Sequence, residues 1–205
     1  MGDLRERILD LQRKCYECRK CQLGTRMVEG LDPHVFASGK PDADVMFVGE
    51  SPGKTETERH APLVGAAGQF FEANILVPAG LSRQSVYITN SVLCRPNEKN
   101  RTPFFGEIEE CREHLDAQVL LVSPKLIVVL GNAPLFGVCD EQGITKKRGE
   151  LRWSRTWSDG RKFPVLPMFH PAYCLRGSGL AEMRQDVQLL ADLAADIAAG
   201  KEIMA

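Results

Sequence analysis

Five cysteines in two distant parts of the chain constrain its fold more than any other feature of the sequence. Cys15, Cys18 and Cys21 lie near the amino terminus, whereas Cys94 and Cys111 flank a loop far downstream. One pair of thiolates leaves half of a tetrahedral metal site unfilled, so a four-thiolate site must draw ligands from both parts. We therefore expect the fold to bring the amino-terminal segment against the downstream loop.

Spacing alone leaves open which four cysteines bind and which metal they hold. A ferredoxin-type run would need a further cysteine at position 25, where the chain has Thr25. Five candidates for four places make one cysteine redundant, and we interpret Cys15 as a residue at a helix end. Seven cysteines, an odd number, favour metal ligation over disulfides in a reducing compartment. Zinc and iron-sulfur remain alternatives at this point.

The amino terminus and the composition favour a cytoplasmic domain. The first seven residues are rich in charge and lack an apolar signal core, and no run of twenty apolar residues occurs. With 205 residues, of which 43% are hydrophobic, we expect a single domain over residues 1–205. We expect it to act as a monomer with no membrane association.

The charge is unevenly distributed. The net charge of −1 does not by itself indicate nucleic-acid binding, but residues 144–163 carry seven lysines and arginines against two acids. Such a segment could follow phosphates. The simpler interpretation, which we prefer, is a solvated hairpin face.

Strands and helices alternate along the chain. Short apolar runs typical of buried parallel strands occur at residues 44–49, 85–89, 125–131 and 162–169. Helices are predicted at residues 4–11, 65–77, 108–122 and 180–199, a loop at 24–40, and two antiparallel strands around 159–160. The alternation predicts an α/β fold, a three-layer α/β/α sandwich around a mostly parallel central sheet of about four strands.

Polar residues follow three of these strands at their carboxyl ends. The run Gly49-Glu-Ser-Pro-Gly53 follows the first strand, Asn90 the second, and His170-Pro171 the last. Each alone could be an ordinary turn or a satisfied histidine. Because ligands bind beyond the carboxyl ends of parallel strands, we expect the three elements to form one site.

Taken in order, these residues resemble the iron-sulfur branch, type 4, of the uracil-DNA glycosylase superfamily. The resemblance extends from Cys18 to about Arg176. Its motifs are Cys18-Arg-Lys-Cys21-Gln-Leu23, Gly49-Glu-Ser-Pro-Gly53, Pro62-Leu-Val-Gly65-Ala-Ala-Gly68-Gln69, Tyr87-Ile-Thr-Asn90, Cys94-Arg-Pro96 and Phe169-His-Pro171. It implies the fold of that superfamily and a monofunctional DNA-repair glycosylase. Such an enzyme flips uracil out of single- or double-stranded DNA, hydrolyses the N-glycosidic bond and leaves an abasic site.

The resemblance also selects the metal ligands. It implies that Cys18, Cys21, Cys94 and Cys111 hold a structural [4Fe-4S] cluster, with zinc as the alternative, and that Cys15 is spare.

Five residues receive catalytic or base-binding roles from the resemblance and from the chemistry of the reaction. Excision of a flipped base leaves negative charge on the departing uracil, so donors to that anion are the main requirement. His170 is expected to donate to uracil O2, and the backbone of Glu50 and Ser51 to add donors. Asn90 is expected to read the pyrimidine edge. Glu56 is expected to position or activate the attacking water, and we hypothesise that Ser51 helps to hold it.

Several further residues are expected to contact DNA. We expect Arg95, Lys99 and Arg101 to contact phosphates, with Arg176 and residues 146–148 as further candidates. Cys174 stands where relatives place a leucine that enters the vacated stack, and Leu175 is the candidate substitute.

Leu63 stands where the family has a phenylalanine that stacks on uracil. This departure leaves two alternatives to uracil excision: a glycosylase with altered base specificity, or a non-catalytic iron-sulfur protein that binds DNA or senses redox state. Phe70, Phe71, Phe104 and Phe105 are candidates for a substitute ring.

Overall fold

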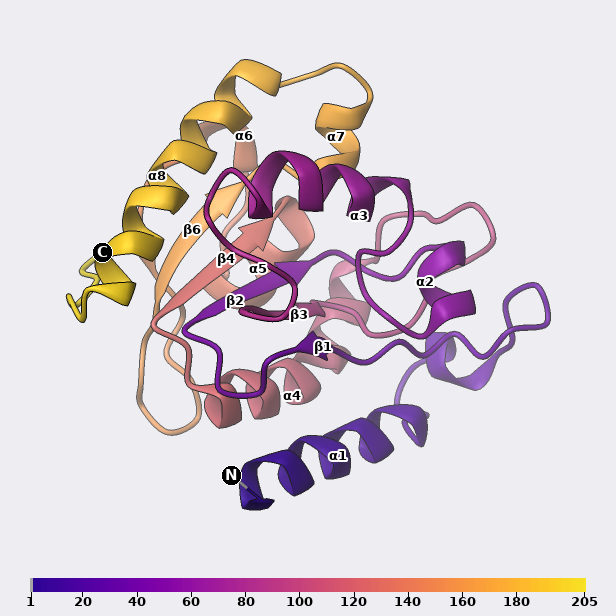
Figure 1. The fold of residues 1–205 in the computed structure, drawn as a ribbon. Helices are drawn as coiled ribbons and strands as arrows, with labels where there is room; N and C mark the ends of the chain where they lie inside the picture. Colours follow the sequence, from indigo (N-terminus) through magenta and orange to yellow (C-terminus); the bar gives the residue numbers. More distant parts are fainter. Residues whose placement is uncertain (1) are drawn as a thin grey trace.

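A parallel sheet forms the centre of the protein (Figure 1). The computed structural model describes residues 2–205, and in this range the sheet has six strands in the order β1-β3-β2-β4-β6-β5. The strands are β1 (Ser38–Gly39), β2 (Val45–Gly49), β3 (Tyr87–Asn90), β4 (Leu126–Leu130), β5 (Arg152–Trp153) and β6 (Pro164–Met168). The four longer strands pair in parallel and the two short edge strands pair antiparallel.

This sheet confirms the prediction of a mostly parallel α/β fold. The four parallel strands coincide with the four apolar runs, and β5 and β6 form the predicted antiparallel pair. The strand β1 corrects the prediction of a continuous loop over residues 24–40. Two residues are too few to leave an alternating pattern in the sequence, and β1 depends on its pairing with β3.

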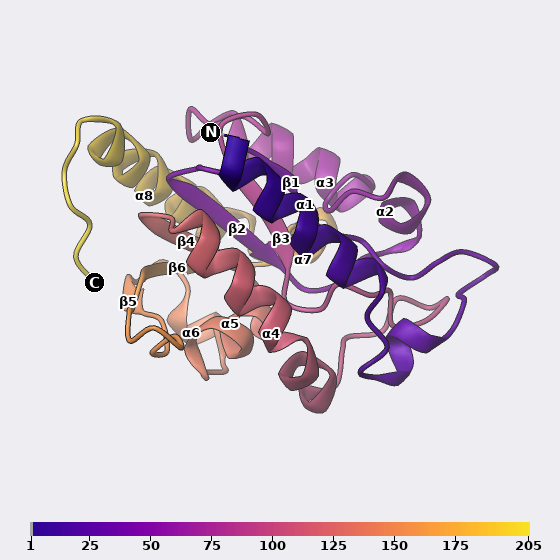
Figure 2. The same ribbon diagram turned by 90° about the horizontal axis from the view of Figure 1, so that it is seen from below.

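Helices cover both faces of the sheet. The views in Figures 1 and 2 place α1 (Gly2–Tyr16), α4 (Phe105–Val122) and α5 (Asn132–Cys139) on one face, and α3 (Ala66–Phe71) and α8 (Leu180–Ala198) on the other. Every residue of β2, β4 and β6 is buried between these layers. Their continuous apolar sequences follow from burial on both faces. No helix within residues 2–205 has the length and apolar character needed to cross a membrane.

Three short helices were not predicted. They are α2 (Lys54–Arg59), α6 (Ile144–Lys147) and α7 (Pro171–Leu175). The sequence of α2 is almost entirely polar, so it has no apolar periodicity, and α7 begins with the His170-Pro171 pair that marks a turn. The predicted helix 65–77 is present, but its second half continues as a π-helical segment, η2 (Glu72–Leu76).

Three arginines of the basic segment 144–163 turn toward the protein, whereas Lys146, Arg161 and Lys162 are exposed. Arg148 binds Asp186 of α8, with Nε 2.7 Å from Oδ2, and Asp186 is only 1% exposed. Arg152 binds Glu141 at 2.8 Å, and Arg155 binds Asp116. These ion pairs connect the basic segment to α4, to α8 and to the loop that follows α5. They give Arg148 a structural role in place of the phosphate contact for which it was a candidate.

Loss of the Arg148 side chain should destabilise the fold in a pH-dependent way. We expect Arg148→Met to lower the free energy of unfolding by about 3 kcal/mol at pH 8, because Asp186 remains buried without a cation. Burial raises the pKa of Asp186, with Arg148 acting in the opposite direction. The carboxyl can therefore accept a proton as pH falls, and the loss should be smaller at pH 5. Denaturant unfolding at both pH values measures this, with the exposed neighbour variant Lys146→Met as control. Equal losses in the free energy of unfolding for Arg148→Met and Lys146→Met would contradict the structural role of Arg148.

Candidate active site

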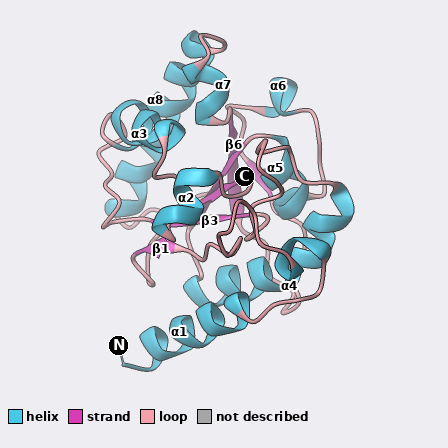
Figure 3. Cartoon of the chain, turned by 90° about the vertical axis from the view of Figure 1, so that its right-hand side faces the viewer, coloured by secondary structure: helices cyan, strands magenta, loops and turns pink. Residues whose placement is uncertain are grey.

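The three polar elements predicted from the sequence meet in one cavity at the carboxyl edge of the sheet. The cavity has a volume of about 520 Å³. Its wall includes Glu50 and Ser51 after β2, Asn90 at the end of β3 and His170 after β6. Figure 3 looks toward this edge of the sheet, with α2 in front and α7 above it. This is the place where parallel sheets bind ligands.

Asn90 is buried against β2. The register pairs Asn90 with Gly49, and a Cβ atom at position 49 would overlap the Asn90 side-chain oxygen. Glycine is therefore required there to let the amide lie beside the strand. The carbonyl of Glu50 accepts hydrogen bonds from Val92 N at 3.1 Å and from Ser91 Oγ at 2.9 Å, which fixes the turn after β2. Burial raises the pKa of the Glu50 carboxyl, and a hydrogen bond with Thr102 opposes this.

Glu56 organises the backbone around the cavity. One carboxylate oxygen accepts from Val64 N at 2.9 Å and Gly65 N at 2.7 Å, and the other from Gly53 N at 3.2 Å. The side chain therefore caps α2 and holds the 63–65 loop against it. A carboxylate has about four acceptor positions, so three are used by the protein. Glu56 is part of the cavity wall, whereas Glu58 on the same helix is exposed.

His170 lies at the amino end of α7 with one tautomer fixed. Its Nδ1 accepts a hydrogen bond from Ala172 N at 3.1 Å, so the proton of the neutral ring must be on Nε2. Burial, with a smaller contribution from the nearby Arg176, lowers the pKa of His170 to about 4, and Glu56 acts in the opposite direction. At neutral pH the imidazole is therefore uncharged and offers one N–H donor.

Leu63 occupies the cavity wall in a strained conformation. Its φ is 52°, an uncommon value for a residue with a side chain. Arg83 donates to the Leu63 carbonyl, and a Cβ atom on Gly68 would overlap that same carbonyl. Strain of this kind persists where the surroundings fix the backbone. The loop is thus held from both sides, with the leucine side chain buried at the cavity.

The cavity wall contains an aromatic ring, that of Tyr173, which was not predicted from the sequence. None of the four phenylalanines considered as substitutes lines the cavity, but Tyr173 does, with its ring 4.9 Å from that of Phe169. Phe71 is fully buried in the core. Lys54, at the start of α2, also lines the cavity and was missed. Their positions next to the glycine-rich turn and the His170-Pro171 pair were the available signals.

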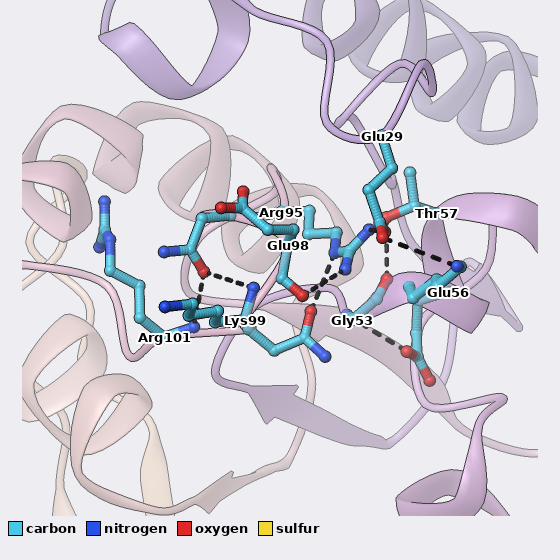
Figure 4. Close-up of polar contacts among 11 residues, drawn as sticks. Glu29, Gly53, Glu56, Thr57, Arg95, Glu98, Lys99 and Arg101 are labelled. Carbon is cyan, nitrogen blue, oxygen red and sulfur yellow. Dashed lines mark hydrogen bonds and ion pairs between the residues drawn. The ribbon is translucent and has the colours of Figure 1, made fainter.

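The loop that follows Cys94 contains the exposed Lys99 and the buried Arg95. Figure 4 shows the polar contacts of this loop. Lys99 is exposed, as expected for a phosphate contact. Arg95 is only 1% exposed, which corrects the prediction that it contacts phosphates. Its guanidinium donates to Glu29 at 2.7 Å, to Asn100 Oδ1 at 2.9 Å and to the Glu98 carbonyl at 3.0 Å. These acceptors surround the cation, so Arg95 supports the loop from inside.

The two candidates for the vacated stack differ in exposure. Cys174 is buried, with Sγ 3.7 Å from the Gly179 carbonyl, so the prediction that it contacts DNA is wrong in this structure. The α7 helix turns that side chain toward the core. Leu175 is 49% exposed on the same helix, and Arg176 lies at the cavity wall.

Three of the predicted cysteine ligands, Cys21, Cys94 and Cys111, lie in one small apolar cluster. Cys94 packs with Leu23 and Ile108, and Cys21 and Cys111 pack against this group. Leu93 N donates to Cys111 Sγ at 3.4 Å. The pKa of the Cys111 thiol is raised to about 12, mainly by burial; the hydrogen bond from Leu93 N opposes this, and the neighbouring Cys18 and Cys21 act in the same direction as burial. The amino-terminal segment therefore meets the downstream loop as predicted.

His34 joins the two cysteine segments. Its backbone pairs with Cys94, while its Nε2 lies 3.1 Å from the Cys18 carbonyl and its Nδ1 2.5 Å from Asp32. A Cβ atom on Gly24 would lie 2.5 Å from the Cys18 carbonyl, so glycine is needed beside this contact. Cys15 lies one residue before the end of α1, in agreement with its interpretation as a helix-end residue, and is buried with Phe36 and Leu93. As placed, no three histidine, cysteine or acidic side chains within residues 2–205 could hold a metal ion.

Comparisons with known proteins agree with this arrangement. Residues 36–194 match the family model of the uracil DNA glycosylase superfamily. A type-4 uracil-DNA glycosylase of Sulfurisphaera tokodaii is 36% identical over 199 residues, which cover 94% of this chain and 86% of that protein. Proteins of the same description from Archaeoglobus fulgidus and Thermotoga maritima are 35% and 37% identical, over 86% and 85% of this chain and 87% and 84% of their own lengths. The chain belongs to the uracil DNA glycosylase superfamily and, within it, to the type-4 uracil-DNA glycosylases.

Proposed function

We propose that this protein is a DNA-repair enzyme that excises uracil from DNA by hydrolysing the N-glycosidic bond, leaving an abasic site. The observation that carries the proposal is that Asn90 and a neutral His170 line the same cavity. Membership of the type-4 family supports it. The cavity is large enough to receive a base, which must rotate out of the DNA before its glycosidic bond can be reached.

His170 supplies the donor that the leaving group needs. Negative charge develops on uracil as the bond breaks, and a positioned N–H stabilises it. The hydrogen bond from Ala172 N keeps Nδ1 unprotonated, so Nε2 carries the proton. Because the histidine N–H is fixed before the base arrives, no reorganisation accompanies the reaction. Asn90 offers a donor and an acceptor to the pyrimidine edge, as discrimination of uracil from cytosine requires.

Glu56 and Ser51 would hold the attacking water. Three of about four acceptor positions of Glu56 bind backbone N–H groups, which leaves one for a water molecule at the cavity. Ser51 lines the same cavity and can add a second hydrogen bond. Glu56 would thus orient the water from a carboxylate whose position is fixed by the backbone.

We propose that the substrate is uracil-containing DNA, single- or double-stranded, bound by a monomer in the cytoplasm. The exposed Lys99 and Arg176 would contact the phosphates, and Leu175 would enter the vacated stack. Affinity for DNA should then fall steeply with salt concentration, because phosphate contacts release counterions.

We propose further that Cys18, Cys21, Cys94 and Cys111 hold a structural [4Fe-4S] cluster. Burial raises the pKa values of the Cys94 and Cys111 thiols, and the neighbouring cysteines act in the same direction. Such thiols fit a site in which a metal cluster supplies the compensating positive charge. When bound, the cluster would crosslink the amino-terminal segment to the loop that carries Lys99. It takes no part in the bond cleavage.

A glycosylase with altered base choice is the second candidate. It is favoured by Leu63, whose buried side chain gives the cavity apolar contact without an aromatic face. Loss of stacking on the flipped base is worth roughly 1 to 3 kcal/mol.

An oligonucleotide assay tests the function. We expect single-turnover cleavage, revealed by alkali, at uracil and not at hypoxanthine, xanthine or mismatched thymine. His170→Ala should lower the rate by about 10²-fold or more, because it removes a donor to the developing anion. His60→Asn, at an exposed histidine outside the cavity, is the matched control and should retain the wild-type rate. Preferred cleavage at another base would support the second candidate, and no cleavage at any base would contradict both.

Replacement of Glu56 should affect both stability and rate. Glu56→Gln exchanges one acceptor oxygen for an amide donor that faces backbone N–H groups, so we expect a loss of about 1 to 3 kcal/mol in the free energy of unfolding. The excision rate should fall at a temperature where the variant is fully folded. Glu58→Gln, on the exposed side of α2, is the control. A lower free energy of unfolding with an unchanged excision rate would assign Glu56 a purely structural role.

Cysteine replacement tests the ligand set. We expect wild-type protein to contain about four iron atoms per chain and a broad visible absorption, and Cys18→Ala and Cys94→Ala each to lose both. Cys15→Ala should retain iron because that thiol packs against Phe36 and Leu93. Equal loss in Cys15→Ala would contradict the assignment of Cys15 as the spare cysteine, and retention of iron in Cys18→Ala would refute the selection of Cys18. Zinc in place of iron would favour the alternative metal.

A further inference from the structure

An exposed aromatic ring lies beside the proposed DNA-binding loop. Phe104 is 65% exposed, the largest exposed fraction of any aromatic residue in the part of the chain that the structure describes. It immediately precedes α4 and is not part of the cavity wall. Neither the proposed base excision nor the proposed metal site uses it.

The ring has a fixed position despite its exposure. Phe104 N donates to Glu107 Oε2 at 2.8 Å, which caps the amino end of α4. Arg101 binds the same carboxylate through two nitrogens, at 2.8 and 2.6 Å, and its guanidinium carbon lies 4.1 Å from the centre of the Phe104 ring. The guanidinium therefore supports the ring as a cation–π partner, and Glu107 holds both.

Arg101 and Phe104 lie next to the cavity along the chain. Asn100 and Thr102, on either side of Arg101 in the chain, both line the cavity. The exposed ring is thus two residues beyond the wall that would receive a flipped base. Lys99, also exposed, lies in the same loop and supplies positive charge for a strand to follow.

We propose that Phe104, supported by Arg101, is a stacking platform for an unpaired base next to the flipped nucleotide. Removal of a base from the stack leaves its neighbour without a partner, and in a single strand none of the neighbours is paired. An aromatic face is worth roughly 1 to 3 kcal/mol to such a base, independent of its sequence. The inference rests on the proposed function, since it assumes a DNA substrate.

The platform should act by stacking and not by charge. The Glu107 carboxylate neutralises the positive charge of Arg101, so the pair adds little net attraction for phosphate. Loss of the Phe104 ring should therefore weaken binding without changing its salt dependence, whereas loss of the Lys99 charge should reduce the salt slope. The effect should be greater for single-stranded than for double-stranded DNA.

Binding measurements with Phe104→Ala test the proposal. Fluorescence anisotropy with a single-stranded oligonucleotide that contains one uracil should give a dissociation constant raised by about fivefold or more, with an unchanged salt slope. Phe104→Trp should restore the affinity. Val77→Ala is the matched control, because Val77 is 66% exposed and lies outside the cavity wall. A 2-aminopurine placed next to the uracil should be quenched by wild type and Phe104→Trp but not by Phe104→Ala.

Other outcomes separate this inference from the proposed function. If wild type excises uracil while Phe104→Ala binds and quenches as wild type does, the platform is wrong and the function stands. The same holds if Phe104→Ala loses no more affinity than Val77→Ala. A wild-type protein that neither binds nor cleaves uracil DNA would overturn both.

Discussion

The parallel pairing of β2 with β3 is the constraint on which the site depends. Its register places Gly49 opposite Asn90, and the absence of a Cβ atom at Gly49 lets the Asn90 amide lie beside the strand. The turn that begins at Gly49 is then fixed by two hydrogen bonds to the Glu50 carbonyl. Since both strands are buried on both faces, a slip of either strand would disrupt the core as well as the site. The specificity of the cavity is therefore tied to the stability of the sheet.

Two ionisable groups of the cavity, Glu56 and His170, lie at the starts of short helices, and each caps its helix. Glu56 accepts from backbone N–H groups at the start of α2 and in the 63–65 loop, and His170 accepts from Ala172 at the start of α7. Helix ends leave backbone N–H groups without partners, so these bonds form whether or not a substrate is present. The same bonds fix the tautomer of His170 and the orientation of the Glu56 carboxylate. Preorganisation of the site thus follows from secondary structure rather than from contacts with a ligand.

The sequence predicts features that depend on neighbours in the chain, and fails where distant partners decide. The four parallel strands follow from apolar runs, and Asn90 and His170 follow from their places at strand ends. The burial of Arg95 depends on Glu29, and the inward turn of Arg148 on Asp186, so neither was visible in the local sequence. Cys174 faces the core because of the orientation of α7, which has too few residues for a helical pattern. Charge alone could not separate these arginines from the exposed Lys99.

The cysteine segment and the loop proposed to bind DNA form one structural unit. Cys94 and Cys111 bound the stretch that contains Lys99, Arg101 and Phe104. On the amino-terminal side, His34 connects Cys18 to Cys94, and Glu29 pairs with Arg95 inside the loop. Hydrogen bonds and an ion pair therefore hold the loop at its Cys94 end independently of any metal. A metal bound by the cysteines would add a link at the second end, through Cys111 on α4, next to the helix start that positions Phe104. The proposed metal site would thus affect DNA binding through the loop, at a distance from the atoms that react.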